Sequence, residues 1–328
     1  DDLTRAQVNT EQRQVGGSIV HIKYDEKGLW KVVKNSKYNH RITGLTEIPI
    51  QADRPIAGSK TAMGTLANCA GGQTPWGTVL TCEENYDNFY GEVEHLGPGK
   101  TKFSGTTKRD NGWRKFYKNP PEHYGWVVEV DPIKKTAIKR TGLGRFSHES
   151  ATVHSLRDGR VVVYSGDDRA NECLYRFISA KPYSLEQGEL FVADTKNGLW
   201  KSLDINKSEV LKKNFKDQTE VLIHCRKAAK LVGGTPLDRP EDVEIHPKTG
   251  HVYVTLTNNK KAGNLHGAIM KIEPHNGDHS SEKFKMDTFL AGGEDTGFSC
   301  PDNLAFDSKG NLWMCCDVST SSVGKGDY

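Results

Sequence analysis

The sequence contains no long hydrophobic run and no excess of charge of one sign. None of its apolar stretches is long enough to cross a bilayer as a helix. Its 45 Lys and Arg residues are balanced by 42 Asp and Glu residues, which gives a formal net charge of +3. Proteins that bind nucleic acid or anionic membranes usually carry a basic segment, so neither partner is expected. A length of 328 residues is enough for one large domain with a sizeable core.

The seven cysteines follow no spacing that is typical of a zinc finger or a Cys-x-x-Cys redox motif. Cys315 and Cys316 are adjacent, and neighbouring strand residues point to opposite faces, so a disulfide between them is not expected. No signal peptide and no initiator methionine precede Asp1. The last ten residues are loop-like and directly follow a predicted strand. We therefore expect a single domain over residues 1–328 that is truncated at both ends.

Short runs of β-branched and aromatic residues, separated by glycine-rich turns, dominate the chain. Such runs are typical of β-strands, and they lie at residues 18–22, 126–130, 160–164, 251–255 and 311–315. Helical periodicity is weak, and only the stretch 220–231 is predicted to form a short helix. Strands do not alternate with helices, which argues against a parallel α/β fold. The sequence therefore predicts an all-β protein.

Units of two strands recur along the chain. Each unit runs from an acidic residue through alternating apolar residues and a turn with glycine into a second strand. The copies lie at residues 239–254, 300–314 and 147–163, with a degenerate fourth copy at 66–82. Repeats of this kind are typical of β-propeller blades or β-sandwiches. Their spacing exceeds that of a minimal blade, so we expect long inserted loops, of which the polar, lysine-rich segment 91–124 is predicted to lie on the surface.

Acidic residues occupy equivalent positions in these units. The innermost strand of a propeller blade lies beside the central channel, so residues just before it, or just after its partner, are expected to meet. The positions before the inner strand hold Glu149, Glu241, Asp302 and Asn303, and those after its partner hold Cys82, Glu83, Glu84, Asp167, Asp168, Asn258, Asn259 and Asp317. Unpaired carboxylates on one axis repel one another, and multivalent cations relieve that repulsion. Oxygen ligands suit Ca²⁺ or Mg²⁺, whereas a thiolate such as Cys82 suits iron or zinc, so a mixed metal cluster is predicted.

Each of these residues also has a simpler interpretation. An acid ahead of a strand is often a cap or turn residue, and a buried cysteine is more often a packing residue than a ligand. The guanidinium of Arg239 fits a phosphate or a carboxylate, but a salt bridge to Glu241 or Asp242 would explain it equally well. The metal hypothesis therefore rests on several acids recurring at equivalent positions.

Several longer strings resemble the PhoX-type alkaline phosphatases. They lie at residues 77–85, 125–132, 144–149, 164–168, 238–242 and 301–307. The resemblance runs from about Gly64 to Asp317, and it implies a six-bladed β-propeller with elaborated loops. Family members carry further sequence before Asp1 and after Tyr328, so the propeller is expected to be incomplete unless missing segments or a partner chain complete it.

The resemblance also implies a phosphomonoesterase that acts on small phosphate esters at two ferric ions, calcium ions and a bridging oxo group. Cys82 resembles an iron ligand, and Arg239 resembles the phosphate-binding residue. The other ligands of iron or calcium that the resemblance implies are Glu83, Glu84, Glu149, Asp168, Glu241 and Asp302. A metal-bound oxide or hydroxide would attack, which agrees with the lack of a Gly-x-Ser-x-Gly elbow. Family members are exported, so a periplasmic or extracellular location is implied.

Two other functions remain open at the level of sequence. A calcium-dependent lactonase or esterase on a similar propeller would use acids and asparagines such as Asp302 and Asn303, but it would not need Cys82 or Arg239. A non-catalytic propeller that binds calcium could serve as a scaffold, and it would hold calcium without iron.

Overall fold

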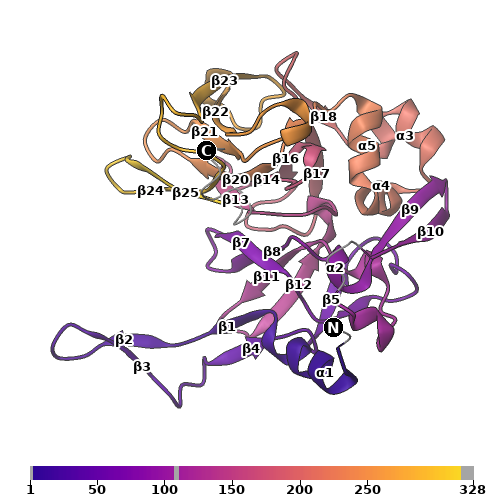
Figure 1. The fold of residues 1–328 in the computed structure, drawn as a ribbon, viewed down its shortest axis with the longest axis vertical. Coiled ribbons are helices and arrows are strands. Elements are labelled where there is room, and N and C mark those ends of the chain that lie inside the picture. Colours follow the sequence, from indigo (N-terminus) through magenta and orange to yellow (C-terminus); the bar gives the residue numbers. More distant parts are fainter. Residues whose placement is uncertain (1–2, 107–110, 319–328) are drawn as a thin grey trace.

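The computed structural model describes residues 3–106 and 111–318 of the chain. Three sheets of four or more strands follow one another along the sequence, and a two-stranded sheet comes after them (Figure 1). The first sheet has the order β6-β5-β12-β11-β8-β7 and consists of β5 (Glu47–Gln51), β6 (Thr61–Met63), β7 (Asn68–Gln73), β8 (Val79–Glu83), β11 (Val127–Asp131) and β12 (Thr136–Arg140).

The later sheets are antiparallel and follow the chain order. The second sheet consists of β13 (Thr152–Ser155), β14 (Val161–Gly166), β16 (Leu174–Ser179), β17 (Gly188–Asp194) and β18 (Leu199–Ser202). The third consists of β20 (Pro240–Ile245), β21 (Val252–Leu256), β22 (Ala268–Pro274) and β23 (Phe284–Ala291). The fourth consists of β24 (Pro301–Phe306) and β25 (Leu312–Cys316). Four of the five predicted strands therefore exist, with bounds that differ by one or two residues. The strand predicted at 18–22 does not, because the chain leaves β1 (Gly17–Ile19) at Val20 and enters a separate strand, β2 (Ile22–Tyr24).

One edge strand of each sheet contacts the corresponding strand of the next, in the order β7, β13, β20 and β24. Glycines allow the close approach of these inner strands. A Cβ atom on Gly72 in β7 would lie 2.0 Å from the carbonyl oxygen of Ala151, and one on Gly166, at the end of the neighbouring strand β14, would lie 2.3 Å from that of Pro240. Successive sheets that meet along their inner strands form a β-propeller, which confirms the predicted fold class.

Apolar clusters fill the space between successive sheets. The first cluster includes Leu80 of β8 and Val163 of β14. The second includes Tyr164 of β14 and Val254 of β21. Because neighbouring residues on a strand point to opposite faces, Val163 and Tyr164 bury both sides of the second sheet. A smaller cluster around Leu304 joins the third sheet to the fourth.

Helices lie outside the sheets. They are α1 (Arg5–Gln14), α2 (Asp87–Tyr90), α3 (Glu209–Asn214), α4 (Gln218–Ile223) and α5 (Cys225–Val232). Short 3₁₀ turns are η1 (Trp113–Lys115), η2 (Pro121–His123), η3 (Thr141–Leu143), η4 (Ile205–Lys207), η5 (Lys260–Ala262) and η6 (His275–Gly277). The helix expected at residues 220–231 is present as α4 and α5, which meet at His224. None of the described helices is both long and apolar enough to span a membrane.

The segment 91–124 forms a hairpin of β9 (Glu92–Gly97) and β10 (Lys100–Gly105), followed by η1 and η2. Residues 107–110 within it lie outside the described part of the chain. Trp113 and Tyr124 of this segment are fully buried in a cluster with Val8 of α1. The segment thus supplies part of the core as well as surface.

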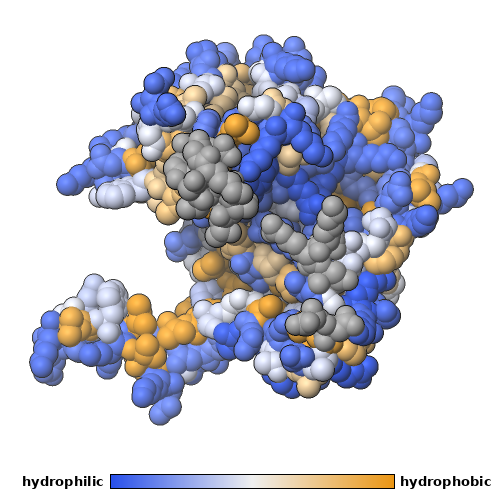
Figure 2. Space-filling view, in the orientation of Figure 1, coloured by the Kyte–Doolittle hydropathy of each residue, from blue (hydrophilic) through white to orange (hydrophobic). Residues whose placement is uncertain are grey.

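Four short strands near the N-terminus and two near the third sheet complete the fold. They pair as β1 (Gly17–Ile19) with β4 (His40–Ile42), β2 (Ile22–Tyr24) with β3 (Trp30–Val32), and β15 (Ala170–Glu172) with β19 (Leu237–Asp238). The β2–β3 hairpin extends away from the body of the molecule (Figure 1). Ile22, Tyr24, Trp30 and Val32 are cross-strand partners, so they share one face. All four are about half exposed, and apolar residues are visible along this hairpin (Figure 2).

Candidate metal centre

An open pocket of about 800 Å³ lies where the ends of the inner strands meet. Its lining contains six carboxylates, which come from Glu84, Glu149, Asp168, Glu241, Asp302 and Asp317. Cys69 and Arg239 also line it, together with Asn85, Asn88, Arg169, Ala170, Asn258, Lys260 and Asn303. Six of the eight predicted site residues are therefore brought together, and these are Glu84, Glu149, Asp168, Arg239, Glu241 and Asp302.

The register of the strand pairs explains why these residues meet. In each repeat unit, one cross-strand pair marks the end of the inner strand, and these pairs are Asn68–Glu83, His148–Asp167, Pro240–Leu256 and Pro301–Cys316. The residue that follows the first member of each pair is Cys69, Glu149, Glu241 or Asp302. The residue that follows the second member is Glu84, Asp168, Thr257 or Asp317. Equivalent positions of a radial repeat thus converge on one axis.

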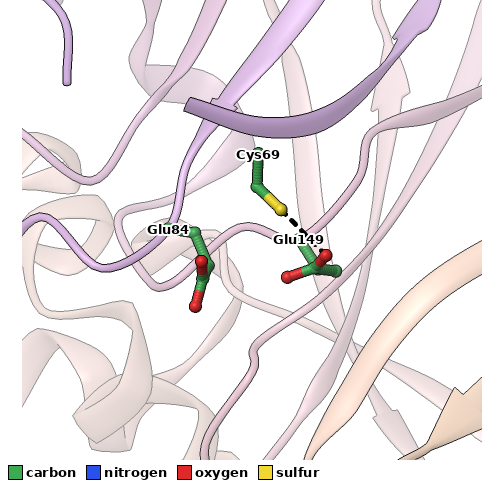
Figure 3. A group of neighbouring side chains, drawn as sticks. All are labelled: Cys69, Glu84 and Glu149. Carbon is green, nitrogen blue, oxygen red and sulfur yellow. Dashed lines mark hydrogen bonds between the residues drawn. The ribbon is translucent and has the colours of Figure 1, made fainter. Parts of the chain in front are cut away.

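Two groups of ligand atoms lie close enough together to hold metal ions. The Cys69 thiol and one oxygen each of Glu84 and Glu149 lie within 4.8 Å of one another. Oxygens of Glu149, Asp168 and Glu241 do the same. Because both groups contain Glu149, this carboxylate can bridge two ions. The Cys69 thiol donates a hydrogen bond to Glu149 Oε1 at 2.9 Å, and Glu84 lies beside them (Figure 3).

The acids of the pocket repel one another and are poorly solvated. Burial, together with the charges of Glu149 and Asp168, raises the pKa of Glu84 to about 9. Burial is also the main cause that raises the pKa of Glu149 to about 7 and that of Glu241 to about 10. Asp302 has a raised pKa, and its buried Oδ1 has no hydrogen-bond partner in the described part of the chain. A cation would satisfy these groups, and a donor set of one thiolate with several carboxylates fits a transition metal such as iron or zinc beside a hard cation such as calcium.

The guanidinium group of Arg239 contacts two of the carboxylates of the pocket. Its Nε donates to Asp168 Oδ1 at 2.7 Å, and its Nη2 lies 2.7 Å from Glu241 Oε1. The residue has a φ of 57°, a left-handed conformation that costs a residue other than glycine about 1–2 kcal/mol. Strain of this kind persists where the surroundings fix it, and such residues gather at functional sites. The contact between Arg239 Nη2 and Glu241 Oε1 is the salt bridge that the sequence analysis gave as one interpretation of Arg239.

Cys82 and Glu83 are not among the residues that line the pocket. Cys82 is fully buried in the apolar cluster between the first two sheets. Both oxygens of Glu83 are already occupied, because Lys139 Nζ donates to Oε1 at 2.6 Å and the backbone N–H groups of Gly125 and Trp126 donate to Oε2. The geometry therefore does not support the prediction that these two residues bind metal.

Cys69, which the sequence did not single out, is the thiol that lines the pocket. It is the cross-strand partner of Cys82, and it occupies the repeat position that Glu149, Glu241 and Asp302 hold in the other units. The fourth repeat copy is degenerate, and its most visible feature is the Cys-Glu-Glu string at its end. An alignment of the repeats from their first strands would have identified Cys69.

Comparisons with known proteins now identify the family. A sequence model described as alkaline phosphatase PhoX matches residues 1–326. The chain belongs to the PhoX family. Among solved structures, PhoX of Pseudomonas fluorescens in complex with vanadate, a transition state analogue, is 33% identical, with a TM-score of 0.83. The alignment covers 94% of this chain and 66% of that PhoX, so the chain spans slightly less than two thirds of its relative. No curated protein matches.

Proposed function

We propose that this chain of the PhoX family hydrolyses phosphate monoesters at a centre of iron and calcium ions. The observation that carries the proposal is the pair of ligand groups that share Glu149, with the guanidinium of Arg239 beside them. The binding of vanadate, a transition state analogue, by the Pseudomonas fluorescens relative supports the same chemistry here.

Cys69, Glu84 and Glu149 would hold iron, because a thiolate favours a softer metal than calcium. The all-oxygen group of Glu149, Asp168 and Glu241, extended by Asp302, suits calcium or a second ferric ion. When bound, these ions supply positive charge that polarises the phosphoryl oxygens and stabilises the charge that develops during phosphoryl transfer.

Arg239 would bind the non-bridging phosphoryl oxygens. A guanidinium matches phosphate in a bidentate manner. Asp168 already fixes its plane through two hydrogen bonds, from Nε at 2.7 Å and from Nη2 at 3.1 Å. Asp168 would thus orient the guanidinium, and Arg239 would orient the ester so that the phosphorus atom faces the ligand groups.

The described lining of the pocket contains no Ser, Thr, His or Tyr that could act as a nucleophile. Its single thiol, Cys69, donates a hydrogen bond to Glu149, and burial raises the pKa of that thiol above the ordinary value. The site therefore favours attack by water over a phosphoenzyme intermediate. Because the pocket is open and polar, we propose small phosphate esters as its substrates. We also propose a periplasmic or extracellular location, since members of the family are exported.

The test is the metal content and the hydrolysis of p-nitrophenyl phosphate by the purified chain. We expect iron and calcium together, and a loss of both metal and activity, by at least about 100-fold, in Glu149→Gln. The matched control is Asp307→Asn, whose carboxylate lies in the turn between β24 and β25, bonded to Asn311. Hydrolysis of a lactone but not of the phosphate ester, or calcium without iron and without hydrolysis, would contradict the proposal.

A further inference from the structure

A second set of polar residues adjoins the ligand candidates, and one of them, Asn303, also lines the pocket. Ser150, Asp242 and Asn303 each follow a ligand candidate, in the second, third and fourth repeat units respectively. Asp242 is the central member and is only 4% exposed. It does not line the pocket, and the proposed chemistry does not use it.

The carboxylate of Asp242 connects the inner strands of three sheets. Its Oδ2 accepts a hydrogen bond from the backbone N–H of Leu304 in β24, at 2.8 Å. Its Oδ1 accepts one from Val243 N–H in its own strand, also at 2.8 Å. The side chains of Ser150, just before β13, and of Asn303 donate to it as well. One buried group thus fixes β20 to β24 and to the start of β13.

Hydrogen bonds of the neighbouring backbone also join the strand of Asp242 to that of Asp302. The N–H of Asp242 donates to Thr255 Oγ1 at 3.0 Å, and that hydroxyl donates to the carbonyl oxygen of Asp302 at 2.6 Å. The backbone of Asp302, and the residue two positions after it, are therefore both held by groups that contact Asp242. Because the Cα atom of Asp302 is bonded directly to the first of these held groups, its own carbonyl, the position of the Asp302 side chain relative to Glu241 depends on them.

A buried carboxylate is costly when its partners carry no charge, and all four donors to Asp242 are neutral. An apolar residue could fill the same space between the strands without that cost. An apolar residue could not replace the hydrogen bonds of Asp242, however. Its two carboxylate oxygens accept from the N–H groups of Val243 in β20 and Leu304 in β24, and so fix the position of one strand relative to the other.

We propose that Asp242 is a positioning residue that sets the spacing between Glu149, Glu241 and Asp302, and thereby the metal affinity of the centre. This inference rests on the proposed function, since it assigns Asp242 to the ligands of the same site. It predicts that weakening Asp242 lowers metal affinity even where the chain remains folded. Outer partners of metal ligands commonly change affinity by about 10- to 100-fold.

The probe is Ca²⁺ alone, titrated calorimetrically into chelator-treated protein, with the iron content of the protein as purified as a second measurement. The variants are Asp242→Asn, which keeps the shape but places an N–H₂ group against one backbone donor, and the milder Ser150→Ala. The control is Glu129→Gln, which replaces a buried carboxylate bonded to Trp76, Thr78 and Arg140 in β11, a central strand of the first sheet. Urea unfolding of each metal-free protein measures the loss of stability separately.

We expect Asp242→Asn to weaken Ca²⁺ binding by about 10- to 100-fold and Ser150→Ala by a smaller factor, with Glu129→Gln within about twofold of the parent at a comparable loss of stability. Should Asp242→Asn not fold, Ser150→Ala decides the question. Unchanged Ca²⁺ affinity in the folded variants, or an equal loss in Glu129→Gln, would overturn the inference. A parent chain that binds neither iron nor Ca²⁺ would instead overturn the proposed function.

Discussion

The two cysteines that face one another in the first sheet provide the sharpest test of the site. Cys69 and Cys82 are cross-strand partners, but only Cys69 lines the pocket and contacts Glu149. We expect Cys69→Ala to lose iron and phosphatase activity. We expect Cys82→Ala to retain both and to lose only stability.

The structure sets the size of the two effects. Cys82 is fully buried among apolar side chains, so its truncation leaves a small cavity that costs about 1–2 kcal/mol. A domain has about 5–15 kcal/mol of stability, so Cys82→Ala remains folded. Cys69 would be a direct ligand. Because the loss of an outer partner already costs about 10- to 100-fold in metal affinity, the loss of the thiolate should cost more than that.

The assay combines iron and calcium analysis of the purified variants with p-nitrophenyl phosphate hydrolysis and urea unfolding. Unfolding shows whether a variant lacks metal because it is unfolded or because it lacks a ligand. The reasoning is refuted if folded Cys82→Ala loses its iron, or if folded Cys69→Ala keeps a full complement. Loss of iron from folded Cys82→Ala would support the iron-ligand role that the family resemblance implies for Cys82.

Three further predictions concern charge. Glu83→Gln leaves the fully buried Lys139 without its partner, so urea unfolding should show a loss of about 3–5 kcal/mol, with an unchanged iron content per folded molecule. Burial raises the pKa of Glu84 to about 9 and of Glu241 to about 10, above the ordinary 4.5. Above about pH 7, where the buried histidines are neutral in both states, the folded metal-free chain therefore holds more protons than the unfolded chain, and its urea midpoint should fall as the pH rises from about 7 to 9. A constant or rising midpoint would contradict this. Arg239→Lys should raise the KM for the phosphate ester about 10-fold with normal metal content, because lysine cannot form the bidentate contact; an unchanged KM would exclude Arg239 from substrate binding.

The repeat units were predictable because each has its own signal in the sequence. Alternation of apolar residues, a glycine turn and an acid at a fixed place identify the strands of 147–163, 239–254 and 300–314 without any long-range information. Once the units are aligned, the convergence of Glu149, Glu241 and Asp302 follows from the symmetry of a propeller. The family of the chain was predictable for the same reason, since the matching strings lie in these units.

The placement of Glu83 was not predictable from the local pattern because a distant residue decides it, and that of Cys69 was obscured by an irregular strand in the degenerate repeat. Glu83 is neutralised by Lys139, which is 56 residues away in the sequence and belongs to another strand of the same sheet. Cys69 is placed by a bulge between it and Gly71, which changes the strand register. The polar composition of segment 91–124 likewise conceals Trp113, which finds its apolar partners only in the folded chain.

The third repeat unit differs from the others at the residue after its second strand, which is neutral instead of acidic. Three units place an acid after the second strand, as Glu84, Asp168 and Asp317, but the third places Thr257 there. The Thr257 hydroxyl donates to Glu241 Oε1, and the same unit supplies Arg239, whose guanidinium also contacts Glu241. A carboxylate at position 257 would add a further negative charge beside Glu241 and would compete with substrate for Arg239. The symmetry of the repeat therefore accounts for the convergence of the candidate ligands, and the neutral Thr257 leaves Glu241 to contact the guanidinium of Arg239.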